Sequence, residues 1–460
     1  MSGPPQQQPR RQGRVMTIEQ FSMAMGSTWI AICARRGRYP RVITAADRAA
    51  LTPRVDDLLA DVQTLRAGGN ITQRSTTRTR APQAGGSASN ASSYNGPVPV
   101  GADATTAVPA AAQSPQTGFI LATIERLDQQ MDSYENPDLQ DEALTNIPFG
   151  EIHATADSMQ SSPDTALPCF EDALAHAVIK WFKPNFFKWA DPMECSACGG
   201  KMDATGSAIP TLEERAGGAD RVELWKCPKD GTDIRFPRYN DLKYLMKSRL
   251  GRCGEFANLF TLMLRAVGLR ARYVWNAEDH VWNEYYSPAQ NRWIHVDSCE
   301  CSRDEPSIYD RGWGKRMSYT IAFGIDGARD VSRRYIYPGG PGKPEDAKPG
   351  DKREATWEEI CAARRTSIAE DRLEEALKAI TRRRRMGRSE DEVKEFERAD
   401  AAETEELLAQ PAAKDGDVDG QGRTSGTKEW VESRGEGGTD ASPAVATDTA
   451  LKEKGDGGNS

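Results

Sequence analysis

The sequence predicts an α+β fold in which a helix that carries a cysteine packs against an antiparallel sheet. Three observations support this fold class. Apolar residues recur at helical spacing directly after Cys253. Aromatic and β-branched residues then fill Ala271–Glu300, a strand pattern with one turn inside it. Upstream, cysteines beside glycines indicate a small separate lobe at about residues 192–237.

The composition separates this folded region from segments of low complexity. Of the 460 residues, 38% are hydrophobic and 28% are charged, a balance that indicates disordered segments attached to a core. In chain order we expect a disordered start (1–14), a short helical segment (15–66), a low-complexity linker (67–117), a folded core (118–345), a charged helical extension (346–410) and a disordered tail (411–460).

Charge and cysteine usage restrict the class of protein. The net charge of −8 argues against general nucleic-acid binding. The N-terminal residues 1–14 lack the apolar region of a signal peptide, and the apolar stretch Ile18–Cys33 is too short and too polar to span a bilayer. With nine cysteines and no export signal, we expect a reducing compartment, the cytoplasm, where metal or catalytic roles outrank disulfides.

The stretch that begins the helix is GRCGEFANLF, Gly251–Phe260. Apolar residues at helical spacing predict a buried helix that ends at Gly268. Backbone N–H groups in a first turn favour negative charge, so a thiol there has a depressed pKa and can act as a nucleophile. The plainer alternative is that Cys253 only fills a gap behind the helix.

The strands that follow predict a hairpin that sets a histidine beside a carboxylate. We place the centre of its turn between Pro288 and Ala289. This register pairs His280 with Asp297, Trp282 with His295 and Glu284 with Trp293. Because side chains alternate along a strand, all six lie on one face of the hairpin.

Cys253, His280 and Asp297 can fill the three roles of a thiol hydrolase. A cysteine nucleophile needs a base to deprotonate it and a third group to fix the tautomer of the base. Taken singly, each has a plainer interpretation as a core cysteine, a structural histidine or a turn-capping aspartate. The chain has only four histidines and two lie in this hairpin, so the joint occurrence favours catalysis.

Five stretches together resemble the cytoplasmic peptide:N-glycanases of the transglutaminase-like superfamily. They are GRCGEFANLF, AEDHVWNEYYSPAQNRWIHVDSCE, FPRYND, WFKPNFFKWADPMECSACGG and DRGWGKRMSYTIAFGIDGARDV. The resemblance covers roughly Phe119–Tyr337 and implies a papain-like, transglutaminase-like core. It implies Cys253 as nucleophile, His280 as general base and acid, and Asp297 as the orienting carboxylate. It also implies that a sugar-binding cleft is lined by Trp282, Trp293 and Glu300.

The resemblance further implies an activity and partners. The reaction would remove N-linked glycans from denatured or misfolded glycoproteins in ER-associated degradation, converting asparagine to aspartate. Helices flanking the core would dock ubiquitin-like proteasome-shuttle proteins. Two alternatives are a scaffold protein without catalytic activity that binds such partners and a protein-crosslinking transglutaminase, which the absence of a calcium-loop pattern disfavours.

The cysteine pairs predict a structural zinc site. Cys195 and Cys198 form one CxxC knuckle, and Cys227-Pro-Lys-Asp230 matches a second, although the peptide:N-glycanases carry cysteine at its last position. Aspartate can ligate zinc, so we expect a site of three thiolates and one carboxylate, weaker than four thiolates. Asp230 could instead be an ordinary turn residue, and a redox role for the CxxC is less favoured.

The charged region after Pro349 predicts three helices. They are Trp357–Arg365, Glu370–Met386 and a third that begins with a capping box at Ser389–Glu392. The basic run Arg382–Arg385 could serve nuclear import, which would add the nucleus as a second location. Cations also suit a solvated helix C-terminus, and we favour that interpretation.

Overall fold

The structure is a computed structural model, and it describes residues 115–164, 166–337, 356–409 and 422–438. The segments predicted at 1–14 and 15–66, and nearly all of the predicted linker, lie outside the described residues. The chain divides into two compact units, and apart from Pro115 every described residue belongs to the unit that contains 116–460.

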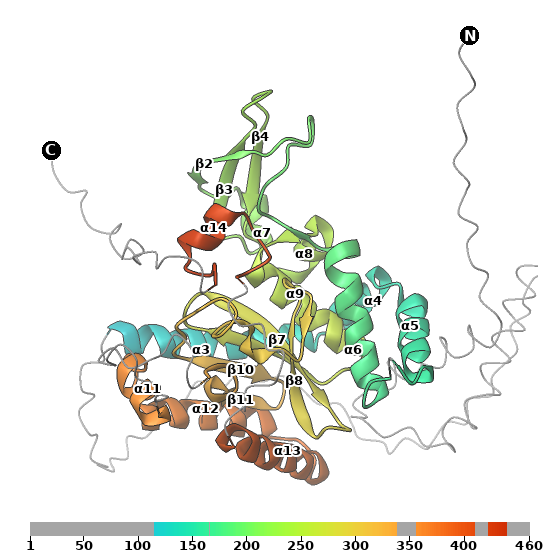
Figure 1. Cartoon of the computed structure of the whole chain (residues 1–460), viewed down its shortest axis with the longest axis vertical. Helices are drawn as coiled ribbons and strands as arrows, with labels where there is room; N and C mark the ends of the chain where they lie inside the picture. Colours follow the sequence, from blue (N-terminus) through green and yellow to red (C-terminus); the bar gives the residue numbers. More distant parts are fainter. Residues whose placement is uncertain (1–114, 165, 338–355, 410–421, 439–460) are drawn as a thin grey trace, which may run out of the picture. The chain divides into compact units, whose positions relative to one another are not determined.

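A six-stranded antiparallel sheet and helix α9 (Cys253–Ala266) form the centre of this unit (Figure 1). The strand order is β11-β10-β6-β7-β8-β9. The strands are β6 (Ala271–Asn276), β7 (His280–Ser287), β8 (Arg292–Asp297), β9 (Ser302–Arg303), β10 (Thr320–Gly324) and β11 (Gly327–Asp330). Helix α9 packs on β6 and β7. The predicted α+β fold, with the cysteine helix against an antiparallel sheet, is confirmed.

The hairpin β7–β8 forms as predicted, but its predicted register is wrong. Ser287 pairs with Arg292 and Glu284 with His295, so the loop holds residues 288–291 and its centre falls one residue later than expected. Asn291 closes this longer loop in the left-handed conformation, with φ at 50°, which asparagine tolerates. The facing partners therefore shift by two positions, a shift that keeps His280 and Asp297 on the same face.

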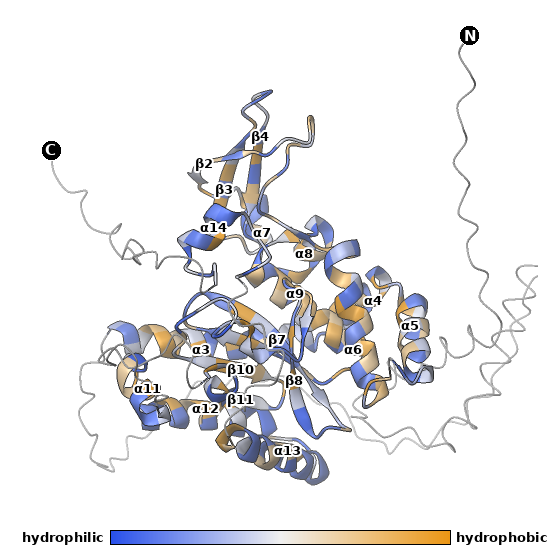
Figure 2. Ribbon diagram, in the orientation of Figure 1, coloured by the Kyte–Doolittle hydropathy of each residue, from blue (hydrophilic) through white to orange (hydrophobic). Residues whose placement is uncertain are grey.

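The two faces of the sheet are covered by different elements. One face packs on α9 through apolar side chains such as Tyr285 and Ile294, which belong to the main core. Figure 2 shows hydrophobic residues concentrated along α9 and hydrophilic ones along α13 (Glu390–Leu408). The other face carries Trp282 and the fully buried Glu284, which binds Arg272 at 2.5 Å. Arg272 also pairs with Glu403 of α13, so buried ion pairs attach this helix to the sheet.

Helices on both sides of the core complete the unit. On the N-terminal side are α3 (Pro115–Tyr134), α4 (Pro137–Asn146), α5 (Phe149–Ser161) and α6 (Phe170–Trp181). Between α6 and α9 lie η1 (Phe182–Phe186), β1 (Lys188–Trp189), α8 (Leu242–Ser248) and β5 (Leu250–Gly251). After β9 come η2 (Pro306–Ile308) and α10 (Ser332–Tyr335). None of the described helices has the length and apolar character that crossing a membrane requires.

The charged C-terminal helices form where the sequence predicts them. They are α11 (Trp357–Arg364), α12 (Glu370–Arg385) and α13, whose N-terminus carries the expected Ser389–Glu392 capping box. The basic run at the end of α12 is not a simple solvated patch, however. Arg384 donates to Asp128 of α3 at 2.6 Å with its side chain only 12% exposed, so the run joins two helices.

A small lobe precedes the core helix. It contains the antiparallel sheet β2 (Asp203–Ala208), β3 (Val222–Lys226) and β4 (Asp233–Pro237), together with α7 (Leu212–Ala216). Its own apolar cluster includes Cys195, Cys227 and Trp225. The sequence predicts this lobe at about residues 192–237.

Residues 422–438, here called the C-terminal strap, correct the prediction of a disordered tail at 411–460. The strap contains the short helix α14 (Lys428–Ser433), which lies beside the small lobe in Figure 1. Hydrogen bonds attach it to the rest of the unit, among them one from Thr427 N to Asp191 Oδ2 at 2.8 Å and one from Ser425 Oγ to the Cys299 carbonyl at 2.9 Å. This part of the tail is therefore an element of the folded unit.

Candidate active site and metal centre

The turn before α9 holds Cys253 as the first residue of the helix. Glu255 fixes this turn, because its carboxylate accepts from the backbone N–H of Arg252 at 3.0 Å and from Arg238 Nε at 2.6 Å. Gly251 is required by close packing, since a Cβ there would lie 2.3 Å from Cβ of Glu255. The residues around the cysteine thus serve to hold the helix start in place, and Cys253 itself remains partly exposed.

His280 and Asp297 meet on the face of the sheet that they were predicted to share. His280 Nε2 lies 2.9 Å from Asp297 Oδ2. The carboxylate also accepts from Tyr309 Oη at 2.9 Å and from the backbone N–H of Cys299 at 2.8 Å. Burial alone would raise the pKa of Asp297, but His280 and the other charges near it lower that pKa well below its usual range. Asp297 is therefore an ionised carboxylate that orients the imidazole.

The second nitrogen of His280 is available to the cysteine. Nδ1 of His280 has no hydrogen-bond partner among the described residues. The imidazole ring lies next to the Cys253 thiol. Burial lowers the pKa of His280, yet Asp297 and Cys253 raise it above its ordinary value. Burial raises the pKa of Cys253, yet His280 and Arg423 bring it below its ordinary value. Both shifts favour a thiolate beside an imidazolium.

The three residues predicted to line a sugar-binding cleft lie in three different environments. Trp282 is fully buried and stacks on Tyr309 with ring centroids 4.2 Å apart, so its ring presents no face to a sugar in this structure. Trp293 lies at the other end of β8 from Asp297, with the Arg272 guanidinium 3.9 Å above its ring. Both tryptophans pack in the interior, and direct sugar contact by them is not supported. Trp282 and Glu300 both adjoin the triad: the Trp282 ring centroid lies 5.6 Å from that of His280, and the backbone N–H of Glu300 donates to Asp297 Oδ1 at 3.2 Å.

Sequence reasoning missed Tyr309 and Trp313. The Trp313 ring lies 5.0 Å from the His280 ring, and Tyr309 Oη also lies 2.7 Å from Nε2 of His295. Because the one hydroxyl proton of Tyr309 goes to Asp297, the hydroxyl accepts from Nε2 of His295. His295 is neutral, since burial lowers its pKa to about 4. Both missed residues lie in a loop, where no periodic pattern marks a buried side chain.

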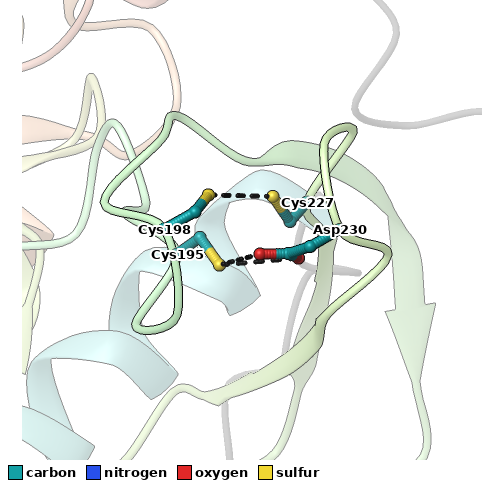
Figure 3. A group of neighbouring side chains, drawn as sticks. All are labelled: Cys195, Cys198, Cys227 and Asp230. Atoms are coloured by element: carbon teal, nitrogen blue, oxygen red, sulfur yellow. Dashed lines mark hydrogen bonds between the residues drawn. The ribbon is translucent and has the colours of Figure 1, made fainter.

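The predicted metal ligands converge in the small lobe (Figure 3). One ligand atom from each of Cys195, Cys198, Cys227 and Asp230 can be chosen so that all four lie within 4.8 Å of one another. Cys198 Sγ lies 3.6 Å from Cys227 Sγ, and Cys195 Sγ lies 3.4 Å from Asp230 Oδ2. Tetrahedral zinc with Zn–S bonds of about 2.3 Å separates its sulfurs by about 3.8 Å. The four residues therefore fit such an ion.

The two halves of this cluster have matching backbones. In the first, Gly199 N donates to the Cys195 carbonyl at 2.8 Å; in the second, Gly231 N donates to the Cys227 carbonyl at 3.0 Å. Both glycines adopt positive φ, 67° and 75°, as such tight turns require. Asp230 thus occupies in the second turn the position that Cys198 occupies in the first. Asp230 Oδ1 also accepts from Thr232 N at 2.9 Å, as a simple turn aspartate would.

Comparison with known families agrees with this architecture. A family model described as the transglutaminase-like superfamily matches residues 207–298, and one described as the Rad4 transglutaminase-like domain matches residues 276–408. The fold and the cysteine site thus define a transglutaminase-like enzyme.

Curated relatives specify the family. The chain is 41% identical over 318 residues to a peptide-N(4)-(N-acetyl-beta-glucosaminyl)asparagine amidase of Candida glabrata, covering 66% of this chain and 83% of that protein. It is 38% identical over 311 residues to the protein of the same name from Yarrowia lipolytica, covering 67% and 82%. The human protein of that name is 37% identical, with 72% and 48% covered. The chain belongs to this amidase family.

Among solved structures, a Rad4–Rad23 complex bound to a 6-4 photoproduct lesion matches at 15% identity with a TM-score of 0.35, covering 63% of this chain and 58% of that one. So low a score supports no statement about this chain.

Proposed function

We propose that this chain cleaves the amide that joins an N-linked glycan to asparagine, through Cys253, His280 and Asp297. The observation that carries the proposal is a partly exposed thiol beside a buried imidazole that an ionised carboxylate orients. The names of the relatives supply the substrate class, the glycosylated asparagine. Denatured glycoproteins are the proposed substrates, because an unfolded chain exposes the side-chain amide to a recessed thiol.

The residues divide the reaction into two steps. In the first, the Cys253 thiolate attacks the asparagine side-chain carbonyl, and the proton held on Nδ1 of His280 passes to the departing glycosylamine. A thioester then links Cys253 to the former asparagine. In the second, His280 takes a proton from water, and the resulting hydroxide attacks the thioester. The C–S bond breaks, Cys253 leaves as the thiolate, and the proton stays on His280 as the imidazolium beside it. The peptide is left with aspartate.

The cysteine cluster is proposed to hold one structural Zn²⁺ through Cys195, Cys198, Cys227 and Asp230. The ion would join the two tight turns, and so would stiffen the small lobe. No catalytic step is assigned to it.

The cellular setting is proposed from the same resemblance. We place the enzyme in ER-associated degradation, in the cytoplasm; the nucleus is a second location only if the basic run Arg382–Arg385 serves import. Ubiquitin-like proteasome-shuttle proteins are the proposed partners of the helices that flank the core. Binding of such a protein by the intact chain, measured by titration calorimetry, would test the partner; no binding at micromolar concentrations would remove it.

The test of the reaction is incubation with a denatured N-glycosylated protein. We expect an increase in gel mobility together with conversion of the modified asparagine to aspartate, seen by peptide mass spectrometry. The Cys253→Ala variant is the matched control and should leave the substrate unchanged. A folded wild-type protein that binds proteasome-shuttle proteins but releases no glycan would instead identify a scaffold.

A further inference from the structure

The C-terminal strap brings one buried cation to the active site. Arg423 is the second described residue of the strap, and its side chain has no exposed surface. Its Nη1 donates to Glu436 of the same strap at 2.8 Å, and its Nε lies 3.5 Å from Oε1 of Glu300. The Arg423 guanidinium is therefore fixed between a carboxylate of the strap and one that follows the catalytic strand β8.

Three tryptophans enclose this guanidinium. The Arg423 Cζ lies 5.0 Å from the ring of Trp189, 4.8 Å from that of Trp313 and 4.7 Å from that of Trp430. Trp313 in turn contacts the His280 ring at 5.0 Å. Trp189 contacts Phe256 of α9 at 5.7 Å, one helical turn from the cysteine. The guanidinium thus lies between one side chain that contacts the base His280 and another that contacts α9, the helix that begins with Cys253.

Two buried nitrogens of Arg423 make no hydrogen bond to the described residues. They are Nη2 and Nε, and the 3.5 Å approach of Nε to Glu300 Oε1 is an ion pair only. Burying a guanidinium whose N–H groups lack hydrogen-bond partners is costly, and a nearby anion that it stabilises would offset part of that cost. The anion that forms in this region during catalysis is the Cys253 thiolate.

We propose that Arg423 is a positioning residue of the active site, whose buried charge stabilises the Cys253 thiolate. The strap therefore completes the site. This inference rests on the proposed function, in which Cys253 is the nucleophile. Stabilisation by charge is strengthened here because the Arg423 side chain has no exposed surface, so water does not screen the guanidinium directly. Consistent with this, Arg423 lowers the pKa of Cys253, and the thiol raises the pKa of Arg423 in return.

Other charged groups face the thiol but do not replace Arg423. His280 is the base itself, and Asp297 is held by it. Arg238 binds Glu255 and Glu223. Asp279 opposes the thiolate, but its side chain is 85% exposed and water screens it. Tyr273 and Cys299 have their pKa values raised well above normal by burial, so both are neutral.

Glu436 does not cancel the charge of Arg423, because three cations share it. Lys315 donates to it at 2.7 Å, and Arg434 lies 3.2 Å from it. Arg434 also provides a matched control. It belongs to the strap, lies 4.7 Å from the same Trp430 ring and pairs with the same Glu436, but its guanidinium points to Asp279.

The experiment measures the rate of Cys253 alkylation by iodoacetamide against pH, read from the peptide that carries Cys253. The variants are Arg423→Gln, Arg423→Lys and the control Arg434→Gln in the full chain. We expect Arg423→Gln to move the midpoint of the alkylation profile upward by about one pH unit. Below the midpoint, this shift corresponds to a roughly tenfold smaller fraction of thiolate. Arg423→Lys should shift it less, and Arg434→Gln should keep the wild-type profile.

Removing Arg423 alone could unfold the strap, because Glu436 would lose a partner. We therefore include the double variant Arg423→Gln/Glu436→Gln, which removes both charges of the pair, and expect the same upward shift of the alkylation midpoint. A wild-type midpoint in a folded Arg423→Gln or double variant would overturn the inference. Equal shifts in Arg423→Gln, Arg423→Lys and Arg434→Gln would also overturn it, since they would indicate strap packing and not charge. If Cys253→Ala still releases glycan, the proposed function fails instead, whatever the alkylation profile.

Discussion

The two cysteine sites of this chain use the cysteine sulfur differently, as a reactive nucleophile at Cys253 and as a metal-ligand type in the small lobe. At Cys253 one thiol begins a helix, partly exposed, with a base beside it and a buried cation nearby. In the small lobe three thiols and a carboxylate face one another, with no histidine in the group. The first environment favours a single reactive thiolate, whereas the second offers four convergent donor atoms, which suit a metal ion.

The comparison shows that the neighbours of a cysteine decide its chemistry. Both sites lie next to glycines in the sequence, but the glycines act differently. Gly251 permits close approach of Glu255 to the helix start, whereas Gly199 and Gly231 supply the positive φ of two metal-type turns. What distinguishes the sites is therefore the set of partners that the fold brings to each thiol.

The largest effect is expected from removing the reactive thiol. Cys253→Ala should lower deglycosylation by at least about 1,000-fold, because no other group in the triad can form the thioester. The melting temperature should stay near that of wild type, measured by circular dichroism. Cys361→Ala is the control: burial raises the pKa of the Cys361 thiol to about 11, and activity should be unchanged. Comparable losses of activity in Cys253→Ala and Cys361→Ala would show that Cys253 is not the specific nucleophile.

The next effect concerns the carboxylate that orients the base. Asp297→Asn should reduce kcat by about 100-fold or more, because the amide neither fixes the tautomer nor stabilises the imidazolium. Asp297 raises the pKa of His280, so its loss should move the alkaline limb of the pH–rate profile to lower pH. An unchanged limb in a folded variant would show that the charge of Asp297 does not control His280.

Replacement of Trp282 should affect stability first. Because the ring is fully buried against Tyr309, Trp282→Ala should lower the free energy of unfolding by about 3–5 kcal/mol. Urea denaturation would measure this, and Ile209→Ala, at a side chain 80% exposed, should change it by less than about 0.5 kcal/mol. Normal stability with weakened binding of a chitobiose-type sugar would restore the predicted sugar contact.

The smallest effect is expected at the metal site. Asp230→Ala should lower zinc retention about tenfold in a chelator titration, whereas Asp230→Cys should increase it, because thiolate is the stronger ligand for zinc. Activity should fall only slightly, since the lobe does not supply the triad. Asp233→Ala, an exposed aspartate nearby, is the control. Zinc content equal to wild type in Asp230→Ala would identify Asp230 as a turn residue only.

The sequence indicates local features better than tertiary ones. The apolar period after Cys253 and the capping box at Ser389 predict α9 and the start of α13, because both patterns depend on neighbours in the chain. The strand alternation places His280 and Asp297 on one face even though the register was two positions off. Packing depth is different: Trp282 and Trp293 look like a binding surface in sequence, and tertiary partners such as Tyr309 and Arg272 cover them in the fold.

The strap shows the same limit. Its sequence lacks a repeating apolar face, so composition indicates disorder, yet single anchors such as Arg423 and Thr427 attach it to the unit. Each anchor finds its partner far away in the chain, at Glu300 or Asp191, and no local pattern records such pairs. The sequence therefore does not indicate Arg423, although it does indicate Cys253, His280 and Asp297.

The most direct test of the proposed cleavage at the asparagine amide is hydrolysis of a denatured N-glycopeptide in water enriched in heavy oxygen. The proposal predicts one heavy oxygen in the side-chain carboxylate of the product aspartate, because water cleaves the thioester on Cys253. It also predicts that the free glycan carries none, since the glycosylamine leaves with its nitrogen and later loses it in a separate exchange that a rapid quench precedes. Heavy oxygen in the rapidly quenched glycan, with asparagine left in the peptide, would contradict attack at the amide carbonyl.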